Sequence, residues 1–221
     1  MHDYKTRFFE LALEKGNLSF GEFTLKSGRI SPYFFNAGGF DDGASLAELS
    51  RCYAAAITAG GIRFDMLFGP AYKGIPLAAA TAIALHQHHQ VNVPYAFNRK
   101  EAKDHGEGGT IVGAPLAGRI LIIDDVISAG TSVREAISII ENAGAQPAGV
   151  AIALDRQERG SGQLSASQEV QREYGLECIA IAGLDDLVLF LENGQSHDIA
   201  GQSAGKIDIQ AIQRYRDRYG V

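Results

Sequence analysis

The sequence predicts an α/β fold: a parallel sheet flanked by helices, with a small N-terminal helix and hairpin placed over it as a hood. Three observations support this class. From residue 65 onward, short apolar runs alternate with segments of helical periodicity, the pattern of a parallel sheet covered on both faces. Residues 120–123 are wholly apolar, as in a strand buried on both sides. Residues 1–40 stand outside the alternation and form the expected hood.

The expected elements follow from periodicity and turn residues. In chain order, the expected strands cover residues 19–25, 31–36, 65–68, 93–97, 120–123, 149–154 and 178–182. The expected helices cover residues 3–15, 42–59, 75–86, 133–140, 165–174, 184–191 and 208–218. Asp3 and Asp42 are expected N-caps, and the pair Gly60-Gly61 is expected to end the second helix. Pro32 favours an edge or bulged strand.

Length and composition indicate one globular domain over residues 1–221. The chain is long enough for a sizeable core, and 46% apolar with 21% charged residues excludes a disordered class. The net charge of −6 disfavours a nucleic-acid partner but allows a small anion, because local cations can override the global sign. Cys52 and Cys178 match no metal or disulfide spacing and are expected to be core thiols.

The sequence also favours a cytoplasmic protein with no membrane partner. The first ten residues, MHDYKTRFFE, are charged too early and too often for a signal peptide. The longest apolar stretch, residues 75–85, is shorter than the ~18 residues that a membrane span needs.

Residues 119–135, RILIIDDVISAGTSVRE, are the most informative stretch. A buried strand ends in Asp124 and Asp125, and the small residues Ser128-Ala129-Gly130-Thr131 lead into a helix. Such a turn presents backbone N–H groups and hydroxyls to an anion at a helix N-terminus. Two carboxylates beside a phosphate site suit ribose hydroxyls or a magnesium ion. The alternative is an ordinary strand-to-helix turn with a Ser or Thr cap.

A second loop, Gly69-Pro-Ala-Tyr-Lys-Gly74, also lies between a strand and a helix. Its glycines allow close approach of a ligand, and Lys73 supplies a point charge. The alternative is a tight turn with a solvated lysine. Two anion-suited loops on neighbouring strands could hold a ligand with phosphates at both ends.

Residues 98–118 form a long polar segment without clear periodicity. It carries the cations Arg99, Lys100 and Lys103, then His105 and a glycine-rich stretch. A long loop with hinges beside clustered charge predicts a flexible lid that closes over an anion. The alternative is a solvated charged loop.

Two further features could recognise a flat, anionic heterocycle. Tyr33-Phe34-Phe35 cannot all face one core, because side chains alternate along a strand. Arg156 follows a predicted strand and should emerge at the same sheet edge as Asp124, where its fork suits a planar carboxylate. The alternatives are core and edge packing for the aromatics, and a surface pair with Asp155 or Glu158 for the arginine.

The histidines of the sequence HQHHQ, which are His86, His88 and His89, could suggest a metal site. Their spacing is poor for one helix face, and no acid or cysteine stands nearby in sequence. A solvated surface is the favoured interpretation.

Four motifs, at residues 26–36, 69–74, 99–109 and 120–131, together with Arg156, resemble the bacterial-type orotate phosphoribosyltransferases. These belong to the type I phosphoribosyltransferases, and the resemblance covers essentially the whole chain. It implies transfer of the 5-phosphoribosyl group from phosphoribosyl diphosphate (PRPP) to orotate. The products are orotidine 5′-monophosphate and pyrophosphate, in pyrimidine (UMP) biosynthesis.

The resemblance also implies roles for residues. It assigns PRPP binding to Lys26, Tyr72, Lys73, Arg99, Lys100, Lys103, His105, Asp124, Asp125, Val126, Ile127, Ser128, Ala129, Gly130, Thr131 and Ser132. It assigns orotate binding to Lys26, Phe34, Phe35, Ser128 and Arg156. The catalytic residues it implies are Lys103, Lys100, Asp125 and Asp124.

The family further implies a Mg²⁺ cofactor, a homodimer and a lid that acts on the neighbouring subunit. No direct protein ligand is expected for the Mg²⁺, which PRPP and water should hold near Asp124 or Asp125. The loop at residues 69–74 often contains a strained or cis peptide in this family, and the candidate bond is Tyr72–Lys73. Ser128 is a departure, since many members carry threonine there, and either hydroxyl can donate to a phosphate or a carboxylate.

Two rival functions differ in what they require. A purine phosphoribosyltransferase would share the PRPP loop but would not need Arg156 or the aromatic hairpin. A non-catalytic, PRPP-sensing regulator should carry a nucleic-acid surface, which the net charge of −6 disfavours.

Overall fold

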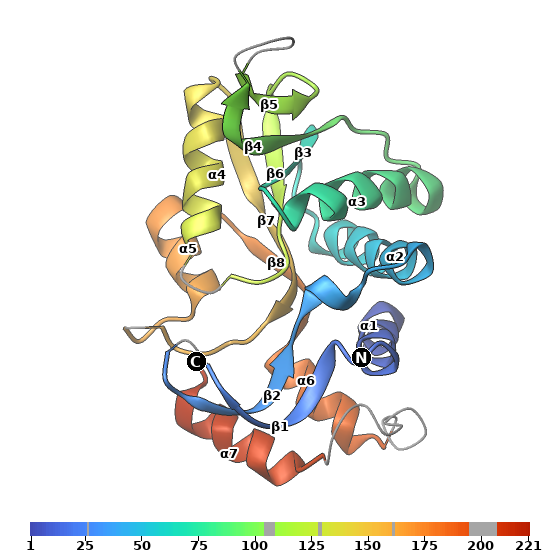
Figure 1. Cartoon of the computed structure of the whole chain (residues 1–221), viewed down its shortest axis with the longest axis vertical. Helices are drawn as coiled ribbons and strands as arrows, with labels where there is room; N and C mark the ends of the chain where they lie inside the picture. Colours follow the sequence, from blue (N-terminus) through green and yellow to red (C-terminus); the bar gives the residue numbers. More distant parts are fainter. Residues whose placement is uncertain (26, 104–108, 128–129, 161, 195–206) are drawn as a thin grey trace.

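The computed structural model describes residues 1–25, 27–103, 109–127, 130–160, 162–194 and 207–221. These residues form a six-stranded sheet with helices on both faces and a separate two-stranded hairpin (Figure 1). The predicted α/β class is confirmed.

The six-stranded sheet places three loops at one edge. Its strand order is β5-β4-β3-β6-β7-β8, and every neighbouring pair is parallel except β4 with β5. The strands are β3 (Met66–Gly69), β4 (Tyr95–Lys103), β5 (Gly109–Gly113), β6 (Arg119–Ile123), β7 (Gln146–Asp155) and β8 (Cys178–Gly183). Because β3, β6 and β7 are adjacent and parallel, the loops that follow them leave the sheet together.

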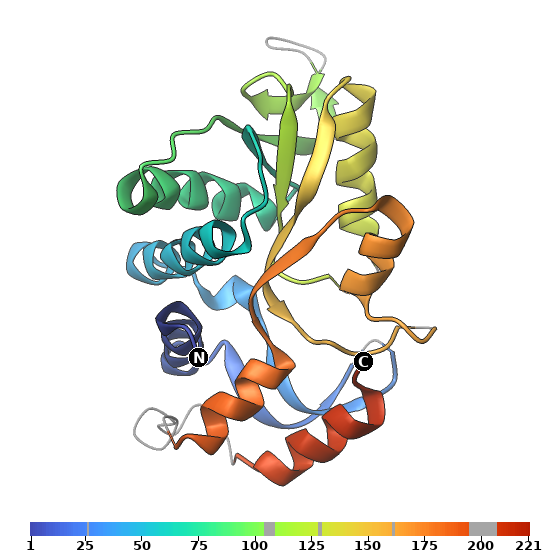
Figure 2. The same ribbon diagram turned by 180° about the vertical axis from the view of Figure 1, so that it is seen from behind.

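Helices cover both faces of this sheet. On one face lie α2 (Gly43–Gly60) and α3 (Gly74–His89), and on the other lie α4 (Thr131–Asn142) and α5 (Ala166–Tyr174) (Figures 1 and 2). The described helices include none long and apolar enough to span a bilayer.

Strand β6 shows why the apolar run predicted a central strand. Leu121 and Ile123 pack into the core beneath α2 and α3, whereas Ile120 and Ile122 pack into the core beneath α4 and α5. All four side chains are fully buried. Each contributes roughly 1.5–3 kcal/mol by leaving water, so the acidic residues that follow start from a rigid support.

The hood contains N-terminal and C-terminal elements. It comprises α1 (Asp3–Glu14), β1 (Leu18–Thr24), β2 (Ile30–Phe35), the 3-10 turn η1 (Ala37–Gly39), α6 (Leu184–Glu192) and α7 (Ile209–Tyr219). Figures 1 and 2 show the hairpin beside α6 and α7 at one end of the molecule, with β4 and β5 at the other. The ion pair of Lys5 with Asp186 (2.8 Å) joins α1 to α6. The C-terminal helices therefore complete a hood that the sequence suggested for residues 1–40 alone.

The predicted ends of α2 are confirmed, whereas the predicted cap of α1 is not. Asp42 caps α2 by accepting from the Ser45 N–H (2.8 Å), and Gly61 ends the helix with φ of 71°. The expected cap at Asp3 is wrong, because His2 is the N-cap residue and Asp3 lies inside the helix. There its carboxylate still faces the positive end of the helix dipole.

The expectation of one irregular segment at 98–118 is also wrong for the described residues. Strand β4 continues to Lys103, and β5 pairs with it antiparallel at the sheet edge. Asn98 opposes Ile111 and Lys103 opposes Gly109. The polar residues that continue β4 carry little hydrophobic alternation, so periodicity did not reveal this part of the strand.

Candidate functional site

The strand β6 ends in two buried carboxylates. Asp124 and Asp125 are only 6% and 7% exposed. The N–H of Asp125 donates to Oδ1 of Asp124 (2.9 Å), and the Tyr53 hydroxyl on α2 donates to the Asp124 carbonyl (2.7 Å). The Asp125 carbonyl accepts from the N–H of Ala153 on β7 (2.9 Å). The backbone of the acidic pair is thus fixed by neighbouring elements.

Burial, followed by the neighbouring Asp125 carboxylate, raises the pKa of Asp124 to about 6. Hydrogen bonds from the Asp125 N–H and the Ser132 hydroxyl oppose this rise. The Lys73 ammonium lies 2.6 Å from Oδ2 of Asp125. The pair therefore holds one carboxylate matched by a cation and one that is costly to ionise.

The loop between β3 and α3 is shaped by close backbone contacts. A Cβ at Gly69 would lie 2.0 Å from the Gly74 carbonyl oxygen, so no larger residue fits. Asn98 on β4 accepts from the Ala71 N–H through its side chain (2.9 Å). The loop contains a cis peptide between Ala71 and Tyr72, one bond before the Tyr72–Lys73 bond that the resemblance suggested.

Cations gather beside this loop. The Lys100 ammonium lies 5.3 Å from the centre of the Tyr72 ring, and the Tyr72 side chain is highly exposed. Nη1 of Arg99 is buried and has no hydrogen-bond partner among the described residues. Lys73 is half-exposed although it pairs with Asp125. An incoming anion could satisfy these groups, since buried guanidinium N–H bonds are costly when unpaired.

The loop after β6 leads into α4. Gly130 precedes the helix with φ of 71°, which favours glycine, and Thr131 and Ser132 form the first turn. Val126 and Ile127 are half-buried before it. This geometry gives the predicted anion site its helix N-terminus.

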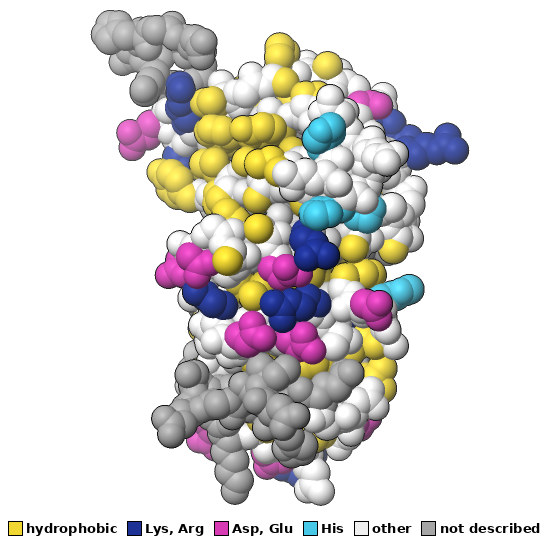
Figure 3. All heavy atoms as spheres, turned by 90° about the vertical axis from the view of Figure 1, so that its right-hand side faces the viewer, with side chains coloured by type: hydrophobic (Ala, Val, Ile, Leu, Met, Phe, Trp, Pro, Cys, Tyr) yellow, Lys and Arg dark blue, Asp and Glu magenta, His cyan; other side chains and the backbone are white. Residues whose placement is uncertain are grey.

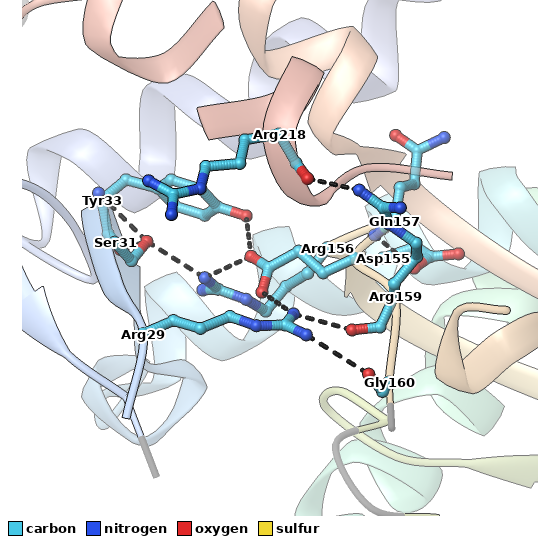
Figure 4. A network of polar contacts seen from close by, with 10 residues as sticks. Arg29, Ser31, Tyr33, Asp155, Arg156, Gln157, Arg159, Gly160 and Arg218 are labelled. Carbon is cyan, nitrogen blue, oxygen red and sulfur yellow. Dashed lines mark hydrogen bonds and ion pairs between the residues drawn. The ribbon is translucent and has the colours of Figure 1, made fainter. Parts of the chain in front are cut away.

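Arg156 follows β7 and lies in a buried polar network (Figure 4). Its Nη2 lies 2.6 Å from Oε1 of Glu158 and donates to Oγ of Ser31 (3.1 Å). Its guanidinium carbon lies 4.4 Å from the centre of the Tyr33 ring. The side chain does pair with Glu158, but it is only 21% exposed and faces the hood.

The aromatic run on β2 alternates as expected. Tyr33 is fully buried, Phe34 is 43% exposed, and Phe35 packs toward the core against Phe8 (5.6 Å between ring centres). Phe34 stacks on Phe23 of β1 (5.5 Å). Phe34 is therefore the more exposed of the two phenylalanines, and Phe35 is partly buried.

Some predicted site residues lie outside the described residues. These are Lys26, His105, Ser128 and Ala129. Lys103 ends β4, but its side chain is not described.

Sequence reasoning missed four residues that shape the site. Asn98, Tyr53, Arg29 and Glu158 are each held by contacts with residues distant in sequence. For Glu158 the available signal was its position two residues after Arg156, which entered the sequence analysis only as one partner in the alternative of a surface ion pair.

The donor set fits a magnesium ion that a substrate would mainly hold. Asp124 and Asp125 supply carboxylate oxygens, which Mg²⁺ prefers, but Asp125 is engaged by Lys73. In the described part of the chain no group of three or more His, Cys, Asp or Glu side chains could hold a metal. The exposed His86 and His88 belong to no such group.

The two cysteines behave as predicted core thiols. Cys52 is buried and Cys178 is partly buried, and neither forms a disulfide. Burial raises the pKa of both thiols to about 12.

Comparisons with known proteins agree with this geometry. Residues 40–171 match the phosphoribosyl transferase domain. The chain is 60% identical, over the full length of both chains, to the orotate phosphoribosyltransferase of Thioalkalivibrio sulfidiphilus, and 59% identical to that of Aeromonas salmonicida. Its fold matches the crystal structure of the orotate phosphoribosyltransferase of Francisella tularensis with a TM-score of 0.82, at 39% identity and with coverage of 97% and 99%.

Proposed function

The chain belongs to the orotate phosphoribosyltransferases, and we propose that it transfers the 5-phosphoribosyl group from PRPP to orotate. The products are orotidine 5′-monophosphate and pyrophosphate, in pyrimidine biosynthesis. One observation carries the proposal. The ion pair of Lys73 with Asp125 joins the loop after β3 to the loop after β6 at one edge of the sheet, and both loops are suited to bind an anion. Each loop would bind the phosphate group at one end of PRPP, and the ribose would lie between the two loops.

The donor would lie across the loops after β3 and β6. The α4 N-terminus suits the 5′-phosphate, and Lys73, Arg99 and Lys100 suit the pyrophosphate. Asp124 and Asp125 would orient the ribose hydroxyls. Tyr72, which is also proposed to bind PRPP, lies beside Lys100 and would approach the pyrophosphate with it.

The acceptor would lie between the hood and the loop after β7. The Arg156 guanidinium would bind the carboxylate of orotate, and the exposed Phe34 of the adjoining strand β2 would contact its ring. Phe35 would contribute through its position on the strand, because its side chain faces the core.

The residues suggest a mechanism driven by charge and orientation. Cleavage of the C1–pyrophosphate bond leaves positive charge on the ribose, which ionised Asp124 and Asp125 would stabilise. The departing pyrophosphate gains negative charge, which Lys73, Arg99 and Lys100 would hold. Orotate is already an anion, so orientation by Arg156 would bring its nitrogen to C1 without a strong base. A bound Mg²⁺ would neutralise pyrophosphate charge.

Residues 98–118 are part of the proposal as a catalytic lid. In the described residues this segment is the β4–β5 hairpin at the sheet edge. Lys103 and His105 would reach the pyrophosphate and exclude water that hydrolyses the activated ribose.

The lid would act on the partner subunit of a homodimer. Support comes from apolar side chains exposed near β4 and α3, namely Tyr72, Ile83 and Tyr95. Figure 3 shows hydrophobic side chains gathered on the upper part of the face that carries α3. A cytoplasmic location belongs to the same proposal.

The function is tested by following orotate absorbance after adding PRPP, Mg²⁺ and the protein. Loss of absorbance that requires PRPP is expected. Adenine, hypoxanthine and uracil tested in parallel should yield little or no nucleotide. Turnover of a purine with none of orotate would overturn the proposed acceptor.

The lid is tested with Lys103→Ala, which should lower turnover roughly 100-fold with less effect on PRPP binding. Mixing Lys103→Ala with Arg156→Ala subunits should restore one intact site in each heterodimer. Turnover near that of the unchanged protein would refute the lid, and failure of mixed dimers to recover activity would refute its action on the partner.

A further inference from the structure

Glu158 lies at the centre of the buried network around Arg156. Its carboxylate is only 10% exposed. Oε1 lies 2.6 Å from Nη2 of Arg156 and accepts from the Tyr33 hydroxyl (3.3 Å), while Oε2 lies 3.9 Å from Nη1 of Arg29. Burial of a carboxylate costs free energy unless the carboxylate is paired. We therefore asked what the pairing of Glu158 with Arg156 does for the site.

We propose that Glu158 is the positioning residue for base recognition: it holds Arg156 in the orientation that binds the carboxylate of the acceptor base. The inference rests on the proposed function, in which Arg156 receives orotate. Glu158 itself would not touch either substrate.

The hydrogen bonds of Arg156 support this division of labour. Nη2 of Arg156 pairs with the Glu158 carboxylate and donates to the Ser31 hydroxyl. The Tyr33 ring lies against the guanidinium, with its centre 4.4 Å from the guanidinium carbon. The guanidinium is therefore held at Nη2 and against the Tyr33 ring, with the Tyr215 hydroxyl also close to it. Its remaining N–H groups would serve the ligand.

The charges of the network suit a single anion. Arg29 and Arg156 face one carboxylate, Glu158, so this largely buried group keeps an unbalanced positive charge. Without Glu158 the two guanidinium groups would repel each other, and Arg156 would lose its orientation. With Glu158 in place, the carboxylate of one bound ligand would neutralise the remaining positive charge of the two guanidinium groups.

Glu158 also ties the loop after β7 to the hood. Tyr33 lies within strand β2 and Arg29 directly precedes it, and Arg29 donates to the carbonyls of Arg159 (2.7 Å) and Gly160 (3.2 Å). Phe34 stands next to Tyr33 on the same strand, and its side chain points to the opposite face. The contacts therefore fix strand β2, which carries the proposed base-binding phenylalanines, against the loop that carries Arg156 (Figure 4).

The test is Glu158→Gln, which keeps the shape and removes the charge. The KM for orotate should rise roughly 10- to 100-fold because Arg156 is misplaced, while the KM for PRPP and kcat change less than about 3-fold. Glu135→Gln, an exposed residue of α4 with no ion pair in the described structure, is the matched control and should leave both constants unchanged. Glu158→Asp should fall between the two.

A double-variant cycle separates positioning from general support. In an Arg156→Ala background, Glu158→Gln should add little to the orotate KM, because the residue acts through Arg156. Equal rises in the KM for both substrates, or full additivity in that background, would overturn the inference. If Glu158→Gln fails to fold, as measured by circular dichroism and Tm, the same cycle with Glu158→Asp decides. Absence of orotate turnover in the unchanged protein would instead refute the proposed function.

Discussion

The donor side and the acceptor side of the proposed site are built in different ways. The donor side uses two loops that follow adjacent parallel strands, and its residues lie close together in sequence within each loop. The acceptor side joins β2 to the loop after β7 through side chains about 125 residues apart, such as Tyr33 with Glu158.

The donor side therefore depends on contacts within short stretches of sequence, whereas the acceptor side depends on contacts between distant ones. Backbone geometry and a helix N-terminus form the donor side, with Lys73 and Asp125 as the ion pair that joins its loops. Buried charges and an aromatic ring form the acceptor side. Substitutions should therefore affect the two substrates separately, and the following predictions measure that separation.

The largest expected effect is from Asp124→Asn on the donor side. The amide keeps an acceptor for the Asp125 N–H but removes the charge that would favour a positive ribose. We expect kcat to fall roughly 100- to 1,000-fold, with the KM for orotate nearly unchanged. Steady-state kinetics with each substrate varied in turn measure this. An equal loss of orotate affinity would show that the two sides are not separable.

A smaller effect is expected from Arg156→Lys on the acceptor side. The charge remains, but the planar guanidinium that contacts Glu158, Ser31 and the Tyr33 ring is lost. The KM for orotate should rise roughly 10- to 100-fold, while PRPP affinity stays within about 3-fold. The same assay provides the check, and a selective loss of PRPP affinity would contradict the assignment.

The smallest expected effect is on stability, and it again isolates the donor side. Folding raises the pKa of Asp124 from 3.8 to about 6, so the folded state binds this proton more tightly than the unfolded chain. Its contribution to the free energy of unfolding is present in full below about pH 4, is lost as pH rises to about 6, and stays absent at pH 7.

Asp124→Asn should therefore raise the free energy of unfolding at pH 7 by roughly 2 kcal/mol, and this gain should vanish near pH 4. Urea unfolding without substrate or divalent cation, at both pH values, measures the difference. Glu135→Gln should show no such dependence. A variant that is less stable than the unchanged protein at pH 7 would show that the carboxylate stabilises the fold.

The same contrast explains what the sequence could predict. The donor loops were predictable because a strand, an acidic pair and a helix start lie within residues 119–135. The acceptor network was only partly predictable, because nothing local to Glu158 indicates that Tyr33 and Arg29 surround it. Pattern alone therefore left a surface pair as the alternative to a ligand site for Arg156, whereas the fold places its pair with Glu158 largely out of contact with water.

Two other differences have similar physical causes. Strand β4 extends to Lys103 through polar residues, since its hydrogen bonds with β5 come from the backbone and need no apolar alternation. The C-terminal helix α7 joins the hood by contacts with β2, which no periodicity within residues 208–218 could specify.

The pairing of Glu158 with Gly220 has a consequence for how the acceptor side is anchored. Gly220 bridges to Glu158, and the N–H of Val221 donates to the Gln157 carbonyl (3.0 Å). The residues that follow α7 therefore brace the loop that carries Arg156 through backbone contacts, whereas in the described part of the chain neither donor loop has a backbone hydrogen bond with them. Loosening the end of α7 should for this reason disturb recognition of the base before it disturbs recognition of the donor.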